Sequence, residues 1–250
     1  MENAMQNGMI TKEKKPNRIK LYGVIVGIVM LIVQQLVYFS ANLIAKKVGI
    51  TPWLPKIDAI DNLFTVVPVF VLPYAWSYAY WAMAPMAVSK CDIKHFYNYL
   101  AAYILATILG ALVLIFAPTY MDRVAEGLTT RTGSGFFEWG LQFFYGADGG
   151  DMAYNLFPSF HCLVSTISYL GVMGRKEIRL WYRIYSLVMT ILVYLATLFV
   201  KQHYFLDIIG GAGIAVIAYV LCVKLNAGRI FSALVAKCKA HKEKRKNKEK

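Results

Sequence analysis

The chain has 250 residues and a mass of 28.2 kDa, and 58% of its residues are hydrophobic while only 16% are charged. Soluble domains carry about 25% charged residues, and the mean hydropathy of this chain is +0.48. This composition excludes a soluble enzyme, a secreted disulfide scaffold and a disordered tail protein.

Six runs without a charged residue occupy 136 of the 250 positions. A helix needs about 20 apolar residues to cross the bilayer core. The first four runs reach that length, and the last two reach it if flanking residues extend the helix and a basic side chain snorkels. Long continuous runs favour helices over the alternating strands of a barrel. We therefore expect an all-α, polytopic six-transmembrane-helix bundle from the runs 21–45, 62–89, 95–121, 152–174, 184–200 and 208–223.

Basic residues are distributed unevenly among the segments between these runs. With a cytoplasmic N-terminus, the inner segments hold 21 of the 27 lysines and arginines, and the outer segments hold six. The positive-inside rule therefore predicts that the N- and C-termini are both cytoplasmic. The net charge of +13 follows mostly from this topology, and no nucleic-acid partner is expected.

The sequence predicts one membrane domain with two basic ends. Residues 1–20 form a basic cytoplasmic segment, 21–224 the six-helix domain with a long outer loop at 118–155, and 225–250 a basic cytoplasmic tail. Within this tail, residues 237–250 either contact anionic head groups or form a disordered segment that fixes the topology, and the second interpretation is favoured. No two of the four cysteines share a compartment that permits disulfides, so four free thiols are expected.

Two of the four histidines, His161 and His203, fall at the predicted outer membrane surface. Each comes at the start of a helix that runs from outside to inside. In Pro158-Ser159-Phe160-His161, Ser159 suits a helix N-cap, and the unpaired N–H groups of a helix start suit a phosphate. A lone histidine in such a place is more often an interfacial residue than a catalyst.

His203 and Asp207 are four residues apart, a spacing that places both side chains on one helix face. A carboxylate there accepts the proton of one imidazole nitrogen and leaves the other nitrogen as a nucleophile or base. A single pair of this kind also occurs where polar residues close a helix end. The occurrence of both histidine-bearing turns on the same membrane face favours a functional site.

The outer loop supplies two further candidate features. Arg123 is one of only two arginines outside, and arginine is the preferred partner of phosphate oxygens, although it could also face ordinary head groups. The aromatic stretch 135–146 predicts a short helix in the membrane interface that guides a lipid chain, or an aromatic belt segment. Asp148 and Asp151 are interpreted as loop residues rather than calcium ligands.

With these residues, the chain resembles the type 2 phosphatidic acid phosphatase superfamily. The pattern of that family is Lys-six residues-Arg-Pro, then Pro-Ser-Gly-His, then Ser-Arg-five residues-His-three residues-Asp. Here Pro158 to His161 is similar to the second part, with Phe160 in place of Gly, and His203 to Asp207 is similar to the third. The resemblance spans roughly residues 97–223.

The chain departs from that pattern at the basic positions. Ala196-Thr197 stand where the family has Ser-Arg, Phe116 stands where it has Lys, and Val124 follows Arg123 where it has Pro. In its motifs the chain is more similar to the branch that includes inositol phosphorylceramide synthases and related bacterial lipid phosphatases. Lys201 could replace the missing arginine or be a snorkelling anchor, and the anchor is slightly favoured.

The resemblance implies a role for each candidate residue. His203 attacks phosphorus to give a phosphohistidine, Asp207 orients it, and His161 protonates the leaving alcohol and then activates water or another alcohol. Arg123, Ser159 and nearby backbone N–H groups hold the phosphoryl oxygens. No cofactor or metal is required, and a metal site made of the two histidines and the aspartate is a less favoured alternative.

The function expected from this resemblance is that of an integral membrane lipid-phosphate phosphatase. It would act at the extracytoplasmic face of the cell membrane on a phosphomonoester or pyrophosphate of a lipid, with the bilayer and that lipid as its partners. Two alternatives remain open: a phosphotransferase that passes a phospho-head group to an alcohol, and a non-catalytic transporter or scaffold of the same fold. Neither the lipid nor the oligomeric state follows from the sequence.

Overall fold

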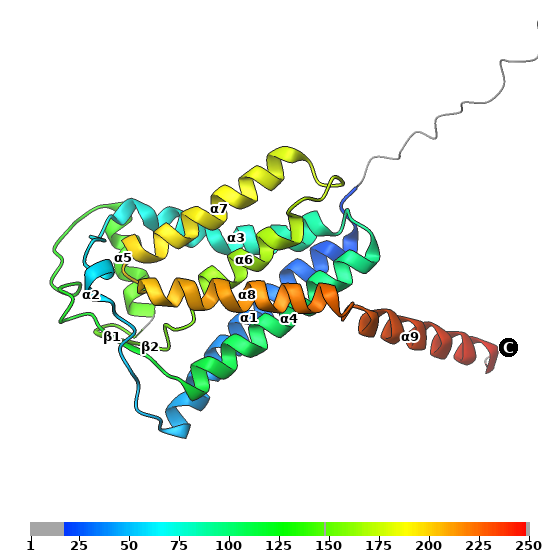
Figure 1. Cartoon of the computed structure of the whole chain (residues 1–250), viewed down its shortest axis with the longest axis horizontal. Coiled ribbons are helices and arrows are strands. Elements are labelled where there is room, and N and C mark those ends of the chain that lie inside the picture. The colour runs from blue at the N-terminus through cyan, green and yellow to red at the C-terminus, as the bar shows by residue number, and fades with distance from the viewer. Residues whose placement is uncertain (1–17, 148, 249–250) are drawn as a thin grey trace, which may run out of the picture.

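The computed structural model describes residues 18–147 and 149–248, and Figure 1 labels its elements. Each of the six apolar runs overlaps one helix of the bundle. The sequence therefore predicted these helices and their order correctly. They are α1 (Leu21–Val48), α3 (Val71–Val88), α4 (Ile93–Phe116), α6 (Phe160–Val172), α7 (Leu180–Phe199) and α8 (Phe205–Lys224).

Four helices of the described chain, α1, α4, α7 and α8, are long and apolar enough to cross a membrane. The run 152–174 was expected to span outright, but its helix α6 has only 13 residues, or about 20 Å at 1.5 Å per residue. The residues before it cannot extend the helix, because Asn155 has a left-handed backbone with φ 59° and Pro158 lacks an N–H.

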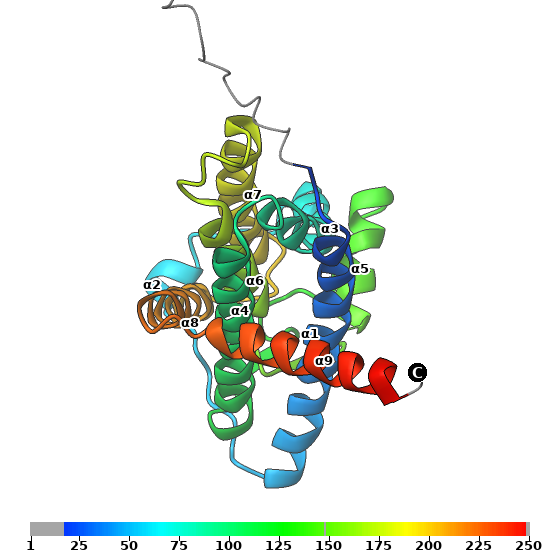
Figure 2. The ribbon, with the colours of Figure 1, turned by 90° about the vertical axis from the view of Figure 1, so that its right-hand side faces the viewer.

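Helix α6 lies at the centre of the bundle. It packs against α3, α4, α7 and α8, and ten of its residues are buried. In Figure 2, α6 and α4 lie between α8 on one side and α1 on the other. The shortest of the six helices is therefore the one that the others surround.

Short elements cover one end of the bundle, at the left of Figure 1. They include one two-stranded ribbon in the otherwise helical fold, in which Met121 lies opposite Ala153. The aromatic stretch 135–146 does form a helix, as predicted. The elements are α2 (Asp58–Asp61), the 3₁₀ helix η1 (Pro68–Phe70), β1 (Tyr120–Asp122), α5 (Phe136–Ala147) and β2 (Met152–Tyr154).

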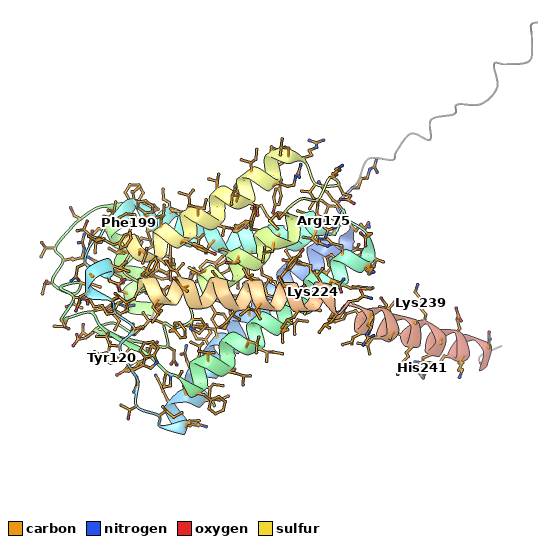
Figure 3. The ribbon with its side chains drawn as sticks, in the orientation of Figure 1. Tyr120, Arg175, Phe199, Lys224, Lys239 and His241 are labelled. Atoms are coloured by element: carbon orange, nitrogen blue, oxygen red, sulfur yellow. The ribbon has the colours of Figure 1, made fainter. Side chains whose placement is uncertain are left out.

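The basic tail forms a helix, so the prediction of a disordered tail was wrong. Helix α9 (Arg229–Lys248) leaves the opposite end of the bundle, with Lys239 and His241 projecting from it (Figure 3). Its second half consists largely of Lys, Glu, Ala and Arg, which have high helix propensity. Residues 1–17 of the N-terminal segment lie outside the described residues, as do Asp148 and 249–250.

Candidate active site

The starts of α6 and α8 are joined directly. Ser159 caps α6, because its Oγ accepts a hydrogen bond from the Cys162 N–H at 3.3 Å, and its own N–H donates to the Asp207 carbonyl at 3.0 Å. A Cβ on Gly211 would lie 2.3 Å from the Ser159 carbonyl oxygen, so only glycine permits this approach. These contacts bring the two histidine-bearing turns together, and they use the Ser159 hydroxyl as a cap.

His203 is held by a buried carboxylate. Its Nδ1 lies 3.3 Å from Oδ2 of Asp207, and the same oxygen accepts the Tyr204 N–H at 2.9 Å. The spacing had predicted that both residues lie on one helix face. His203 instead precedes α8, so the pair is part of the cap of this helix. Because Oδ2 of Asp207 is placed to accept a hydrogen bond from Nδ1–H of His203, the nitrogen that remains for chemistry is Nε2.

His161, on α6, packs against three aromatic side chains of α3. Its ring centroid lies 6.1 Å from that of His203. The ring of Tyr74 stacks on it at 4.1 Å, and Tyr78 and Trp81 meet it edge-on at 5.6 and 5.1 Å. The sequence analysis missed these three aromatics, although their spacing of four and three residues indicates one helix face.

The two imidazoles open onto one cavity of about 330 Å³. Aromatic side chains from α1, α3 and α5 form most of its wall. The amide side chains of Gln34 and Gln35 on α1 also line the cavity. The sequence analysis missed both residues because they lie within an uncharged run. A site of this kind can receive an apolar chain against its wall and present two imidazoles to a polar group.

A family model described as the PAP2 superfamily matches residues 53–221, which include both histidines and Asp207. The chain belongs to the PAP2 superfamily. Comparison with curated proteins and with solved structures found no match. The matched region begins after α1, so Gln34 and Gln35 lie outside the part of this PAP2 protein that matches the family.

Arg123 lies in the loop core and does not line the cavity. It is fully buried, and its guanidinium donates to the carbonyls of Tyr145 and Gly150 at 3.0 and 2.8 Å and to Oε1 of Gln202 at 2.8 Å. Direct contact with phosphoryl oxygens, as the resemblance implies, has no support from this geometry. Arg123 instead fixes the residue that precedes His203.

Lys201 also lies outside the cavity lining. Its Nζ donates to the Asp61 carbonyl at 2.8 Å, and burial lowers the pKa of Lys201. The side chain is buried, whereas a snorkelling anchor reaches into the head groups. In the structure, Lys201 therefore ties α2 to the turn before α8.

The Asp61 carboxylate is a positioning group that the sequence did not reveal. It is 2% exposed, and its two oxygens accept the Phe205 N–H at 2.8 Å and the Ile57 N–H at 2.7 Å. Because Phe205 is the first residue of α8, Asp61 fixes the point at which the helix after His203 begins.

Proposed function

We propose that this PAP2 protein is a membrane lipid-phosphate phosphatase that hydrolyses a lipid phosphomonoester or pyrophosphate through a phosphohistidine on His203, without a metal. One observation carries the proposal: two imidazoles 6.1 Å apart face one cavity, and Asp207 holds Nδ1 of His203. Within the described residues, no group of three His, Cys, Asp or Glu side chains is placed to hold a metal ion.

The chemistry follows from the positions of the two imidazoles. Nε2 of His203 attacks phosphorus as the bond to the lipid oxygen breaks, and His161 gives its proton to that oxygen. A water molecule then attacks the phosphohistidine and loses its proton to His161, which restores both rings. Asp207 stabilises the positive charge that His203 acquires in the first step.

We assign the phosphoryl oxygens to the start of α6. The N–H groups of Phe160 and His161 occupy its first two positions, where a helix offers no internal acceptor. The positive end of the helix dipole adds to their attraction for an anion. Arg123 acts on the site through Gln202 and is a positioning residue in this scheme.

We also propose that the six-helix bundle as a whole spans the cell membrane, with the short helix α6 enclosed by its neighbours, and that the site faces outward. In Figure 3, Arg175 and Lys224 mark one end of the bundle, while Tyr120 and Phe199 mark the other. The histidine-bearing turns belong to the second end, since Ser159 and His203 come at the starts of α6 and α8. The basic end is cytoplasmic by the positive-inside rule.

Phosphate release from a panel of lipid phosphates by the purified protein tests this function. We expect His203→Ala to remove detectable release and His161→Ala to lower it by about 100- to 10,000-fold, the usual contribution of a general acid-base. His241→Ala is the matched control, because His241 is exposed on α9. Absence of release from every lipid would overturn the proposal, and loss of release on chelation would overturn the metal-free mechanism.

A second candidate, a phosphotransferase that gives the phosphoryl group to an alcohol, uses the same first step. It is favoured by the polar side chains that α1 brings to the cavity.

A further inference from the structure

Helix α1 carries a polar stripe through an otherwise apolar span. Gln34, Tyr38, Asn42 and Lys46 follow one another at intervals of four residues, which keeps them on one helix face. Polar side chains within a membrane span cost free energy and are retained where they face a cavity or a partner. Asn42 has a structural partner in Asn155, whose Nδ2 donates to Oδ1 of Asn42, so the rest of the stripe calls for a partner or a ligand.

The stripe lines two adjoining cavities. The cavity at the histidines, of about 330 Å³, includes Gln34, Gln35 and Tyr38. Tyr38 is shared with a second cavity of about 310 Å³, which adds Asn42 and Lys46. Together they form what we call the α1 groove, which extends for about 18 Å along the helix, at 1.5 Å per residue.

A hydrogen-bond relay orients the amide nearest the histidines. Tyr103 Oη donates to Oε1 of Gln34 at 2.9 Å, and Nε2 of Gln34 donates to Oε1 of Gln35 at 3.4 Å. The relay occupies the acceptor oxygen of Gln35 and leaves its Nε2 as a donor at the cavity wall. Gln34 thus has a structural role, while Gln35 offers N–H groups to a ligand.

We propose that the α1 groove binds a hydroxyl-rich alcohol beside the reacting phosphoryl group, with Gln35 as a specificity-determining residue. Amide and tyrosine hydroxyl groups match the oxygens of an alcohol, because they can both donate and accept hydrogen bonds. Lys46 lies at the far end of the α1 groove, and no lysine or arginine is among the described residues that line the cavity at the histidines. The inference rests on the proposed phosphohistidine chemistry.

Two sources of this alcohol share the same chemistry. In the first, it is the head group of the lipid that carries the scissile phosphate. In the second, it is a free polyol that replaces water: its oxygen attacks phosphorus, the bond to Nε2 of His203 breaks, and His161 takes the alcohol proton. The second route yields a phosphate monoester of the polyol.

The free-polyol source is tested with purified full-length protein, short-chain phosphatidate and glycerol. Water and glycerol attack the same intermediate, so the ratio of glycerol phosphate to inorganic phosphate does not depend on how fast that intermediate forms or how much protein is folded. We expect Gln35→Met to lower this ratio at least tenfold. Ser40→Ala is the matched control, since Ser40 faces an apolar groove elsewhere on α1.

The head-group source is tested by comparing kcat/KM for phosphatidylglycerol phosphate with that for phosphatidate. We expect the wild type to prefer the lipid with the glycerol head group and Gln35→Met to reduce that preference at least tenfold. If the protein releases phosphate but neither transfers it to glycerol nor prefers phosphatidylglycerol phosphate, the groove proposal is overturned while the proposed function stands. An equal response of Gln35→Met and Ser40→Ala would overturn the groove proposal too. No release from any lipid would instead reject the proposed function, and this inference with it.

Discussion

At the residue scale, His203 is held from two directions. Asp207 contacts its ring nitrogen and the adjacent backbone N–H, while Asp61 holds the N–H of Phe205 two residues later. The position of His203 therefore depends on a residue more than 140 positions earlier in the chain. Asp61 acts on His203 through the start of α8.

Asp61→Ala is expected to destabilise the protein and lower phosphate release. The change leaves two backbone N–H groups without acceptors, at about 1–3 kcal/mol for each buried donor. We expect a lower Tm in detergent and a reduced kcat, with partial recovery in Asp61→Asn, which keeps one acceptor oxygen. Asp58→Ala is the control on the same short helix, because the Asp58 side chain is 78% exposed. An unchanged Tm in Asp61→Ala would contradict this role.

The candidate site could be predicted from the sequence only in part, and particular residues show why. His161, His203 and Asp207 are recognisable because their residue types and spacing limit what they can do. The contacts of Arg123 and Lys201 could not be predicted, since a cationic side chain looks the same whether it meets a phosphate or a distant carbonyl. The contacts of Arg123 with Tyr145 and Gly150 depend on loop folding, which no local pattern encodes.

At the element scale, α5 exposes an aromatic face and borders the cavity at the histidines. Phe136, Trp139 and Phe143 expose one face of the helix, with Trp139 and Phe143 stacked at 5.9 Å. Phe143 also lines the cavity at the histidines. A helix that exposes aromatics and borders the site is suited to deliver a lipid from the interface.

The ion pair between Arg131 and Glu138 is expected to make the stability of α5 depend on pH. Hydrogen bonds from Arg131 at 2.9 Å lower the pKa of Glu138. Because the pKa of Glu138 is lower in the folded protein than the unfolded value of about 4.3, the ionised side chain stabilises the folded protein at a pH above that unfolded pKa. This stability is lost as the pH falls through the pKa of the folded state. Between about pH 7 and pH 5, we expect the amide hydrogens of α5 to be better protected from exchange in the wild type than in Glu138→Gln.

The difference between wild type and Glu138→Gln should disappear at more acidic pH, where both side chains are neutral. Comparing the two proteins at each pH removes the intrinsic pH dependence of amide exchange. A difference that persisted unchanged in acid would show that the carboxylate charge does not anchor α5.

The helices themselves were predictable because each apolar run is long and its charges lie at the ends. The length of α6 was predictable only in part: Ser159 is recognisable as a suitable N-cap, whereas the apolar run 152–174 by itself predicts a longer helix. Helix α9 was missed for a related reason. Net charge was taken as a sign of disorder, although Lys, Glu and Arg favour helices.

At the scale of the whole molecule, the proposed topology is testable with the native cysteines. Cys91, Cys162 and Cys222 are buried, and Cys238 on α9 is exposed. In intact cells, a membrane-impermeant maleimide should label Cys238 only after permeabilisation. Thr130→Cys in a Cys238→Ser background should label without it, because Thr130 is exposed in the outer loop. The reverse pattern would place the site in the cytoplasm.

The phosphohistidine is the intermediate on which the account depends. Purified protein is mixed with a lipid phosphate that carries ³²P at the scissile group, quenched within one turnover and digested. The account predicts acid-labile, base-stable label on the peptide that contains His203, and none on that peptide in His203→Ala. Rapid phosphate release with no label on His203, or with label on another residue, would contradict it.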